Sequence, residues 1–263
     1  MSVPRLLSTA IAFFAALLIA TAAHSQEKPN AIEKPNAIET DRRDVTPYTV
    51  PRGSLQLENG MAWTVDKSGR ELDLTESLLR VGVGNTTEFR IGAPDYFYRL
   101  GKTMTPPSGF GDLLIGVKQG LGQVAGFDLA VVPAVTFPAG ATGWSSGGID
   151  PQIEFPWQRE LSRPWSISGT LGVFDLTENG RRKPVGECQI ELEREIGERD
   201  DAFVEFQGFD GVGSANHSLQ IGGGHKLKPN QRVDYFVVVG LSRAATNFAA
   251  GIGFSFRLDR LWR

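Results

Sequence analysis

The sequence predicts an all-β fold, an antiparallel up-and-down transmembrane β-barrel of about 12 strands. Segment after segment alternates between bulky apolar residues and small or polar ones, which is the period of a β-strand. After residue 25 no apolar run approaches the ~20 residues that a membrane helix needs. The predicted connections alternate between short and long, as they do on the two sides of an outer-membrane barrel.

Residues 1–25 have the pattern of a secretory signal peptide. Arg5 precedes an apolar run from Leu6 to Ala22, and the small residues Ala23 and Ser25 follow it. We expect cleavage before Gln26 and export from the cytoplasm. An uncleaved membrane anchor is the alternative. The single remaining cysteine, Cys188, excludes an internal disulfide.

Residues 26–52 are polar and contain the tandem hexapeptide EKPNAI at 27–32 and 33–38. Two copies are too few for a repeat architecture. We interpret the segment as a flexible periplasmic tether ahead of a barrel at 53–263. The alternative is an N-terminal plug that enters the barrel.

Strands are predicted from residue 54 onward. Phe127–Phe137 alternates most regularly among the middle strands, with Leu129 and Val131 on one face and Asp128 and Ala130 on the other. A slip of the alternation at Glu76-Ser77 predicts a β-bulge. Prolines 133, 151 and 156 lie inside predicted strands and predict local kinks, because proline removes a ladder donor. The first ten ranges are 54–65, 72–83, 87–98, 111–121, 127–137, 149–160, 165–174, 186–196, 202–209 and 217–227.

The last two strands, within residues 232–258, determine which face meets lipid. Tyr235 and Val237 share one face with other bulky residues, while Asp234 and Ser242 share the other. A soluble sandwich turns bulky side chains inward and charges outward. The small and polar face here suits a polar lumen, so the aromatic-rich face is expected to point into lipid.

Loop lengths give the barrel its orientation. The connections after the second, fourth, sixth and eighth strands are short and are expected in the periplasm. The longer connections, 99–110 and 138–148, are expected outside. Their glycines and aromatics suggest loops that fold inward and gate the opening, and the candidate gating residues are Gly109, Phe110, Gly111, Trp144, Gly147 and Gly148.

Charged residues at inward positions are the candidate lining of the lumen. Alternate side chains of one strand are ~6.6 Å apart, so its four glutamates form an acidic ladder. Facing cations would make either a transverse field that orients polar solutes or a salt-bridged filling of the barrel. The candidates are Arg90, Asp112, Lys118, Asp128, Glu187, Glu191, Glu193, Glu195, Glu205, Asp234 and Arg257. Lys226 is a further cation of the facing wall.

No catalytic residue, metal or cofactor is predicted. His217 and His225 make a poor metal set with Cys188. Alternation places Ser218 inward and His217 outward, which disfavours a Ser-His dyad. The 27 basic and 30 acidic residues show no basic patch, so nucleic acid is not an expected partner.

Several ordered segments resemble the "MetA-pathway of phenol degradation" family of Gram-negative outer-membrane proteins. They are 51–60, 76–82, 88–92, 108–118, 146–151, 202–206 and 251–256, together covering nearly all of residues 53–257. Family members end on a terminal aromatic, whereas this chain continues seven residues past Phe256, to Arg263.

The resemblance implies a porin-like barrel in the cell outer membrane that lets small, in part aromatic, compounds pass. The expected partners are outer-membrane lipid, a small-molecule solute and the barrel assembly machinery during biogenesis. Two alternatives stay open: an outer-membrane lipid-modifying enzyme, and a plugged structural barrel.

Overall fold

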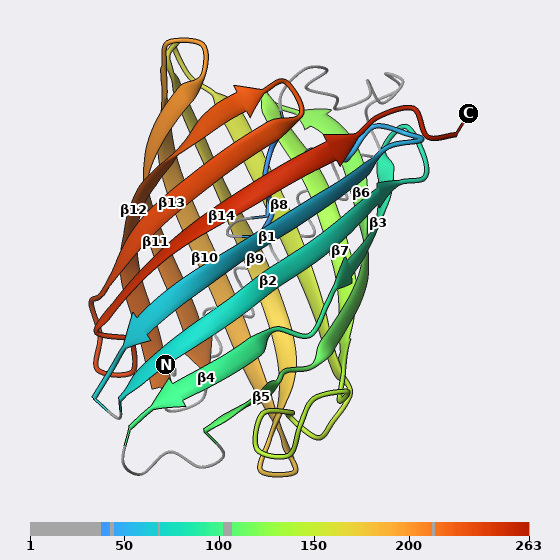
Figure 1. Ribbon diagram of the computed structural model, residues 1–263. Helices are drawn as coiled ribbons and strands as arrows, with labels where there is room; N and C mark the ends of the chain where they lie inside the picture. The colour runs from blue at the N-terminus through green and yellow to red at the C-terminus, as the bar shows by residue number, and fades with distance from the viewer. Residues whose placement is uncertain (1–37, 43–44, 68, 102–106, 212–213, 263) are drawn as a thin grey trace.

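The computed structural model describes residues 38–42, 45–67, 69–101, 107–211 and 214–262. Its strands form one tilted barrel (Figure 1). The predicted signal peptide and the hexapeptide repeat up to residue 37 lie outside the described residues. Among the described residues, no helix is long and apolar enough to cross a membrane.

The barrel is closed and antiparallel, which confirms the predicted fold class. β1 pairs with β2 on one side and with β14 on the other, so the sheet has no free edge. β3 and β4 both pair with β2, and β5 and β6 continue one another in the same way, so the fourteen strands in the described chain form a 12-strand barrel. The strands are β1 (Leu55–Val65), β2 (Arg70–Gly82), β3 (Thr87–Gly92), β4 (Tyr96–Leu100), β5 (Ser108–Phe110), β6 (Leu113–Val124), β7 (Phe127–Phe137), β8 (Asp150–Glu160), β9 (Trp165–Glu178), β10 (Arg181–Ile196), β11 (Asp200–Gly211), β12 (Ser214–Lys228), β13 (Gln231–Gly240) and β14 (Phe248–Leu258).

Most strand ends lie within a few residues of their predicted positions. The largest difference is the hairpin of β9 and β10, where pairing continues out to Arg181↔Glu178. Asn179 and Gly180 both have positive φ, 52° and 72°, which is the geometry of a two-residue hairpin turn. The charged residues near this turn hid the strand ends from the alternation pattern.

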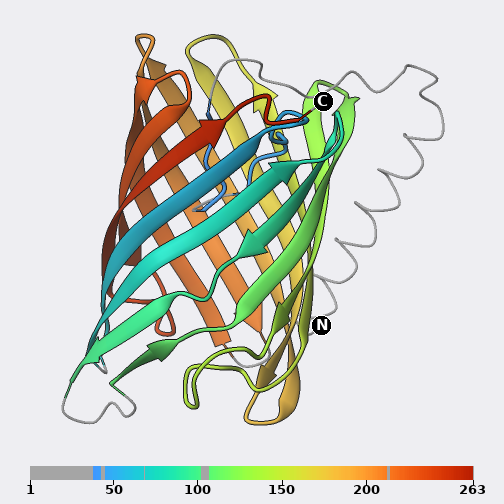
Figure 2. The same ribbon diagram turned by 45° about the vertical axis from the view of Figure 1, so that its right-hand side comes forward.

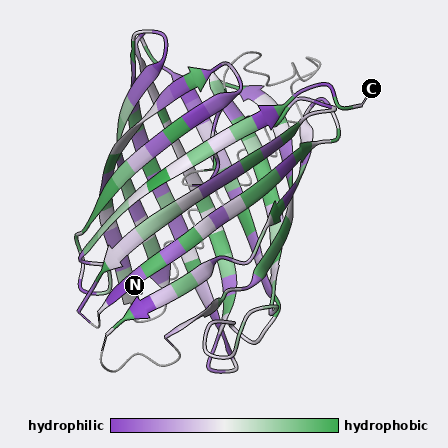
Figure 3. Ribbon diagram, in the orientation of Figure 1, coloured by the Kyte–Doolittle hydropathy of each residue, from purple (hydrophilic) through white to green (hydrophobic). Residues whose placement is uncertain are grey.

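Bulky apolar side chains point outward and polar ones point into the barrel. On β13, Asp234 is 2% exposed whereas Tyr235 is 54% exposed. On β14, Ile252 is 50% exposed and Ser255 is fully buried. Figure 3 shows both kinds of residue along the strands. This sidedness confirms an outer-membrane type of barrel rather than a soluble one.

One part of the wall is irregular. β2 carries the predicted bulge, because Glu58 pairs with Leu78 and Gly60 with Thr75, leaving Glu76 and Ser77 unpaired. Beside it, residues 93–95 separate β3 from β4, and residues 111–112 separate β5 from β6. At Pro133 and Pro151 the ladder keeps its register.

The N-terminal residues ahead of β1 lie inside the barrel, as Figure 2 shows. We call residues 38–42 and 45–50 the lumen segment. Ile38, Asp41 and Val50 are 1%, 4% and 3% exposed. This placement differs from the expected free tether and corresponds to the alternative of a plug, because polar groups of the wall bind the segment.

Candidate functional site

The neighbouring strands β1, β2, β3 and β6 bring five charged side chains together on the lumen face. Strand register places Arg80 opposite Arg90, and Glu88 opposite Lys118. Glu58 lies beside them on β1 and is 3.0 Å from Arg80. Like charges directly opposite each other destabilise a sheet. The Arg80 and Arg90 pair therefore needs an anion between them.

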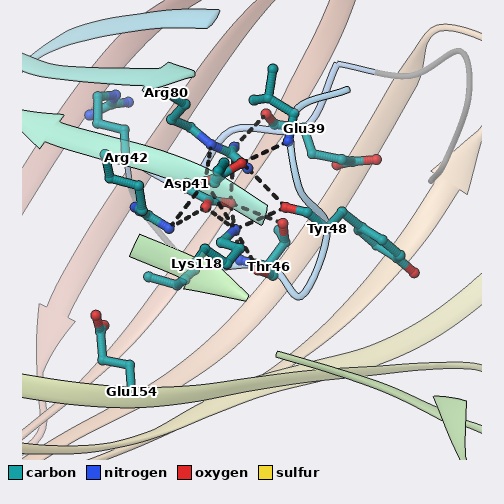
Figure 4. A network of polar contacts seen from close by, with 12 residues as sticks. Glu39, Asp41, Arg42, Thr46, Tyr48, Arg80, Lys118 and Glu154 are labelled. Carbon is teal, nitrogen blue, oxygen red and sulfur yellow. Dashed lines mark hydrogen bonds and ion pairs between the residues drawn. The ribbon is translucent and has the colours of Figure 1, made fainter. Parts of the chain in front are cut away.

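Asp41 of the lumen segment supplies that anion. One carboxylate oxygen, Oδ1, is 3.2 Å from Arg80, and the other, Oδ2, is 2.7 Å from Arg90 and also accepts a hydrogen bond from Lys118 (Figure 4). Burial alone would raise the pKa of Asp41, but Arg80, Lys118 and Arg90 together hold that pKa well below its usual range. We call Asp41, Glu58, Arg80, Glu88, Arg90 and Lys118 the inner cluster; it contains three acids and three bases.

The wall also binds the backbone of the lumen segment. A Glu58 carboxylate oxygen accepts hydrogen bonds from the backbone N–H groups of Asp41 and Arg42, both at 2.7 Å. Glu88 accepts one from the Val50 N–H at 2.7 Å. Lys118 donates to the carbonyl oxygen of Thr46 at 2.7 Å. The strands thus satisfy polar backbone groups that would otherwise be buried without partners.

Contacts on other parts of the wall hold the segment across the lumen. Arg42 forms ion pairs with Glu76 on β2 and Asp234 on β13. The Tyr48 hydroxyl donates to Asp128 on β7 at 3.1 Å, and burial together with that carboxylate raises the pKa of Tyr48. On β9, Thr170 donates to the carbonyl oxygen of Val45 at 3.2 Å.

Little space remains beside the segment. A gap bounded by Glu39, Thr46 and Ser166 has a volume of about 30 Å³, and another near Tyr48 and Arg257 has about 20 Å³. A water molecule needs roughly 10–15 Å³ of such volume, so each gap holds only one or two waters. With the lumen segment in place, neither gap is large enough for an organic solute.

A larger cavity of about 330 Å³, which we call the chamber, lies against the other side of the segment. Asp41, Arg42 and Val45 form its floor, and residues of β2, β3, β6, β7 and β8 form its walls. Pockets for small organic molecules begin at ~300 Å³, so the chamber has room for one.

The loop 138–149 is bound to the wall next to the chamber. Asp112, which lines the chamber, accepts hydrogen bonds from the backbone N–H groups of Gly140 at 2.9 Å and Ser146 at 2.8 Å. Trp144 stacks on Phe97 with ring centroids 5.0 Å apart. Arg99 lies 3.8 Å from the Trp144 ring centroid. The loop therefore folds against the inner edge of β4.

The gating candidates divide between this loop and the wall. Gly109 and Phe110 belong to strand β5 rather than to a loop, because residues 108–110 pair with β4. A Cβ on Gly109 would lie 2.4 Å from the Trp144 ring, so glycine is needed there. Gly111 lies at the break between β5 and β6. Gly147 is in the loop with positive φ, and Gly148 packs against Thr177.

The lumen candidates are also divided. Glu187, Glu191, Glu205, Asp234 and Arg257 are buried in the barrel, between 1% and 7% exposed. Glu193 borders the 30 Å³ gap together with Arg232, and Glu195 is exposed near the end of β10. The proposed wall of cations facing the acidic ladder is not what the structure shows, because Asp41 engages Arg90 and Lys118.

The groups weighed for chemistry lie apart. His217 bonds to Asp210 at 2.9 Å, whereas Ser218 donates to Gln207 at 3.3 Å on the other face of the strand. His225 bonds to Asp200 at 2.6 Å.

Four central residues were not among the sequence candidates: Asp41, Arg42, Tyr48 and Arg80. Arg80 has the inward alternation of its strand, so the periodicity of β2 was a usable signal for it. The other three precede the first strand, where no periodicity shows which way a side chain points.

A closed barrel with an apolar outer face and a polar, charge-lined lumen defines an outer-membrane β-barrel protein. A family model matches residues 40–258, and the chain belongs to that family, described as "Putative MetA-pathway of phenol degradation". The match includes most of the described lumen segment.

Solved structures of channels and porins have a similar fold. The COG4313 outer membrane channel from Pseudomonas putida F1 is 11% identical with a TM-score of 0.61, over 84% of this chain and 100% of that chain. The NanC porin is 9% identical with a TM-score of 0.54, over 78% of this chain and 100% of that one. The KdgM porin is 9% identical with a TM-score of 0.53, over 77% and 98%. No curated protein matches the chain.

Proposed function

We propose that this protein is an outer-membrane channel for passive passage of small molecules, and that the lumen segment closes it. The observation that carries the proposal is the inner cluster, in which the wall of a polar lumen binds a separate piece of chain. That piece is held by ion pairs and hydrogen bonds alone, so it can leave without breaking the barrel ladder. The channels and porins of similar fold support the same role.

The proposed solutes are small molecules, aromatic compounds among them, in line with the description of the family. The export signal at residues 1–25, insertion by the barrel assembly machinery and a lipid-embedded outer face belong to the same proposal. Passage through the lumen needs no cofactor and no covalent step.

A plugged structural barrel is the second candidate, because the lumen segment leaves only water-sized gaps beside it. The two candidates differ in what happens when the segment is absent. A channel conducts once residues 26–50 are deleted, whereas a structural barrel stays closed.

Planar-bilayer conductance of the purified full chain and of the variant lacking residues 26–50 tests the proposal. We expect rare openings for the full chain and sustained openings for the variant. The heat-dependent gel shift of a folded barrel, recorded for both, shows that the variant has inserted correctly. A folded variant without conductance would leave the structural barrel as the function.

A further inference from the structure

The irregular part of the wall removes ladder bonds from three neighbouring strands at one level. Pairing of β2 with β3 stops at Leu78↔Gly92 and resumes with β4 at Leu74↔Tyr96. Pairing of β3 with β6 stops at Gly92↔Leu114 and resumes between β4 and β5 at Tyr96↔Phe110. We call residues 75–77, 93–95 and 111–112 the wall break. It interrupts β3–β4 partway along the barrel, as Figures 1 and 2 show.

Few backbone hydrogen bonds hold the wall break together. The Ala93 N–H donates to the Ser77 carbonyl at 2.9 Å, and the Gly111 N–H donates to the Asp95 carbonyl at 2.8 Å. The Ser77 N–H donates instead to the Asp95 side chain at 3.3 Å. Thr75 and Glu76 have positive φ, 76° and 22°. Irregular backbone at membrane depth is tolerated where it lines a cavity rather than facing lipid alone.

The wall break does line a cavity, namely the chamber. Glu76, Ser77, Ala93, Asp95 and Asp112 all border it. Ala93 is exposed although it lines the chamber, and it shares the outward alternation of its strand. Only the few atoms of the break therefore separate the chamber from the lipid side of the wall.

The other boundaries of the chamber are more firmly held. The floor is the lumen segment, which is bound by the inner cluster. The loop 138–149 is tied to Asp112 by two backbone hydrogen bonds and to Phe97 by the Trp144 ring. The side wall has the fewest interactions per residue of these boundaries.

We propose that the chamber exchanges small amphipathic molecules with the outer membrane sideways, through the wall break. The ligand class follows from the lining: Leu78, Leu114 and Val132 offer an apolar surface, while carboxylates such as Asp73 and Asp95 accept a hydrogen bond. A molecule with an apolar body and one N–H or O–H donor fits both. The proposal rests on the proposed transport function but gives it a lateral rather than an axial exit.

A disulfide across the wall break tests the proposal. Ser77 and Ala93 extend the register of Leu79↔Ile91, so they face each other on β2 and β3. Antiparallel neighbours have Cα atoms about 4.5–5.5 Å apart, within the disulfide range. The variants are S77C/A93C and, as the matched control in intact ladder, L79C/I91C, both with Cys188→Ser.

Intact Gram-negative cells carrying each variant receive N-phenyl-1-naphthylamine, an apolar aromatic amine whose fluorescence rises inside a membrane. We expect oxidised S77C/A93C to lose the protein-dependent rate of uptake and to regain it on reduction. Oxidised L79C/I91C should keep the full rate. Uptake that persists through oxidised S77C/A93C, or the absence of any protein-dependent uptake in its reduced form, would overturn lateral exchange.

Ion conductance separates this result from the proposed axial function. In the background lacking residues 26–50, oxidised S77C/A93C should conduct as the reduced form does, because the staple lies in the wall. Loss of amine uptake together with unchanged conductance supports both proposals. Absent conductance in both forms contradicts the axial channel alone, and conductance that falls on oxidation contradicts a route confined to the wall break.

Discussion

Asp41→Asn removes one charge from the inner cluster and keeps the shape of the side chain. The wall would then hold three buried cations against the two carboxylates Glu58 and Glu88. Breaking a buried ion pair by removing one partner costs about 3–5 kcal/mol. Asparagine still accepts one hydrogen bond, so we expect the lower half of that range.

That free energy acts on the equilibrium between a bound and a released lumen segment. At about 1.4 kcal/mol for each factor of ten, a loss of ~3 kcal/mol raises the released fraction roughly a hundredfold. Single-channel recording of the full chain should show this change as a large rise in open probability. The current through one open channel should not change, because Asp41 leaves the lumen with the segment.

Glu178→Gln is the matched control, since the Glu178 side chain is 58% exposed in a surface pair with Lys183. Surface pairs contribute ~0–1 kcal/mol, so this variant should gate as the wild type does. Combining Asp41→Asn with Lys118→Met restores equal numbers of buried cations and carboxylates. The double variant should open less often than the sum of the two single effects predicts. An Asp41→Asn channel as closed as the wild type would refute the role given to the inner cluster.

Three further predictions concern pH, the outer loop and the lipid face. Because its cationic neighbours hold the pKa of Asp41 below the ordinary 3.8, its contribution to closure is fully present above that value and is lost only as the pH falls through the lower, folded value; open probability at pH 5 should equal that at pH 7. Asp112→Asn removes charge-assisted bonds to the loop 138–149, each worth about 1.5–3 kcal/mol, so chymotrypsin should cleave after Trp144 faster than in Asp175→Asn. Val237→Arg on the lipid face should lower the unfolding free energy in lipid vesicles by about 2–4 kcal/mol, whereas Val237→Leu should not; equal stability of the two would contradict the assigned sidedness.

The wall was predictable because each strand repeats one rule. Outward apolar and inward polar positions alternate, so a strand such as Phe127–Phe137 can be placed to the residue from its own sequence. The two interrupted strands were also predicted as single units, at 87–98 and 111–121. Their breaks were not, because Pro94, Asp95 and Gly111 interrupt the pattern no more than an ordinary bulge does.

The lumen segment was not predictable in the same way. Asp41 and Tyr48 follow no period, and their direction depends on partners that are 39 to 80 residues away in the chain, such as Arg80 and Asp128. The wall, however, carried a usable sign of the missing partner. Periodicity places Arg90 and Lys118 inward beside Arg80, and three buried cations so close together need more anion than Glu58 and Glu88 supply. A polar lead segment with acidic residues was the nearest source of that charge, so an excess of inward cations on adjacent barrel strands predicts a bound acidic segment even where that segment has no pattern of its own.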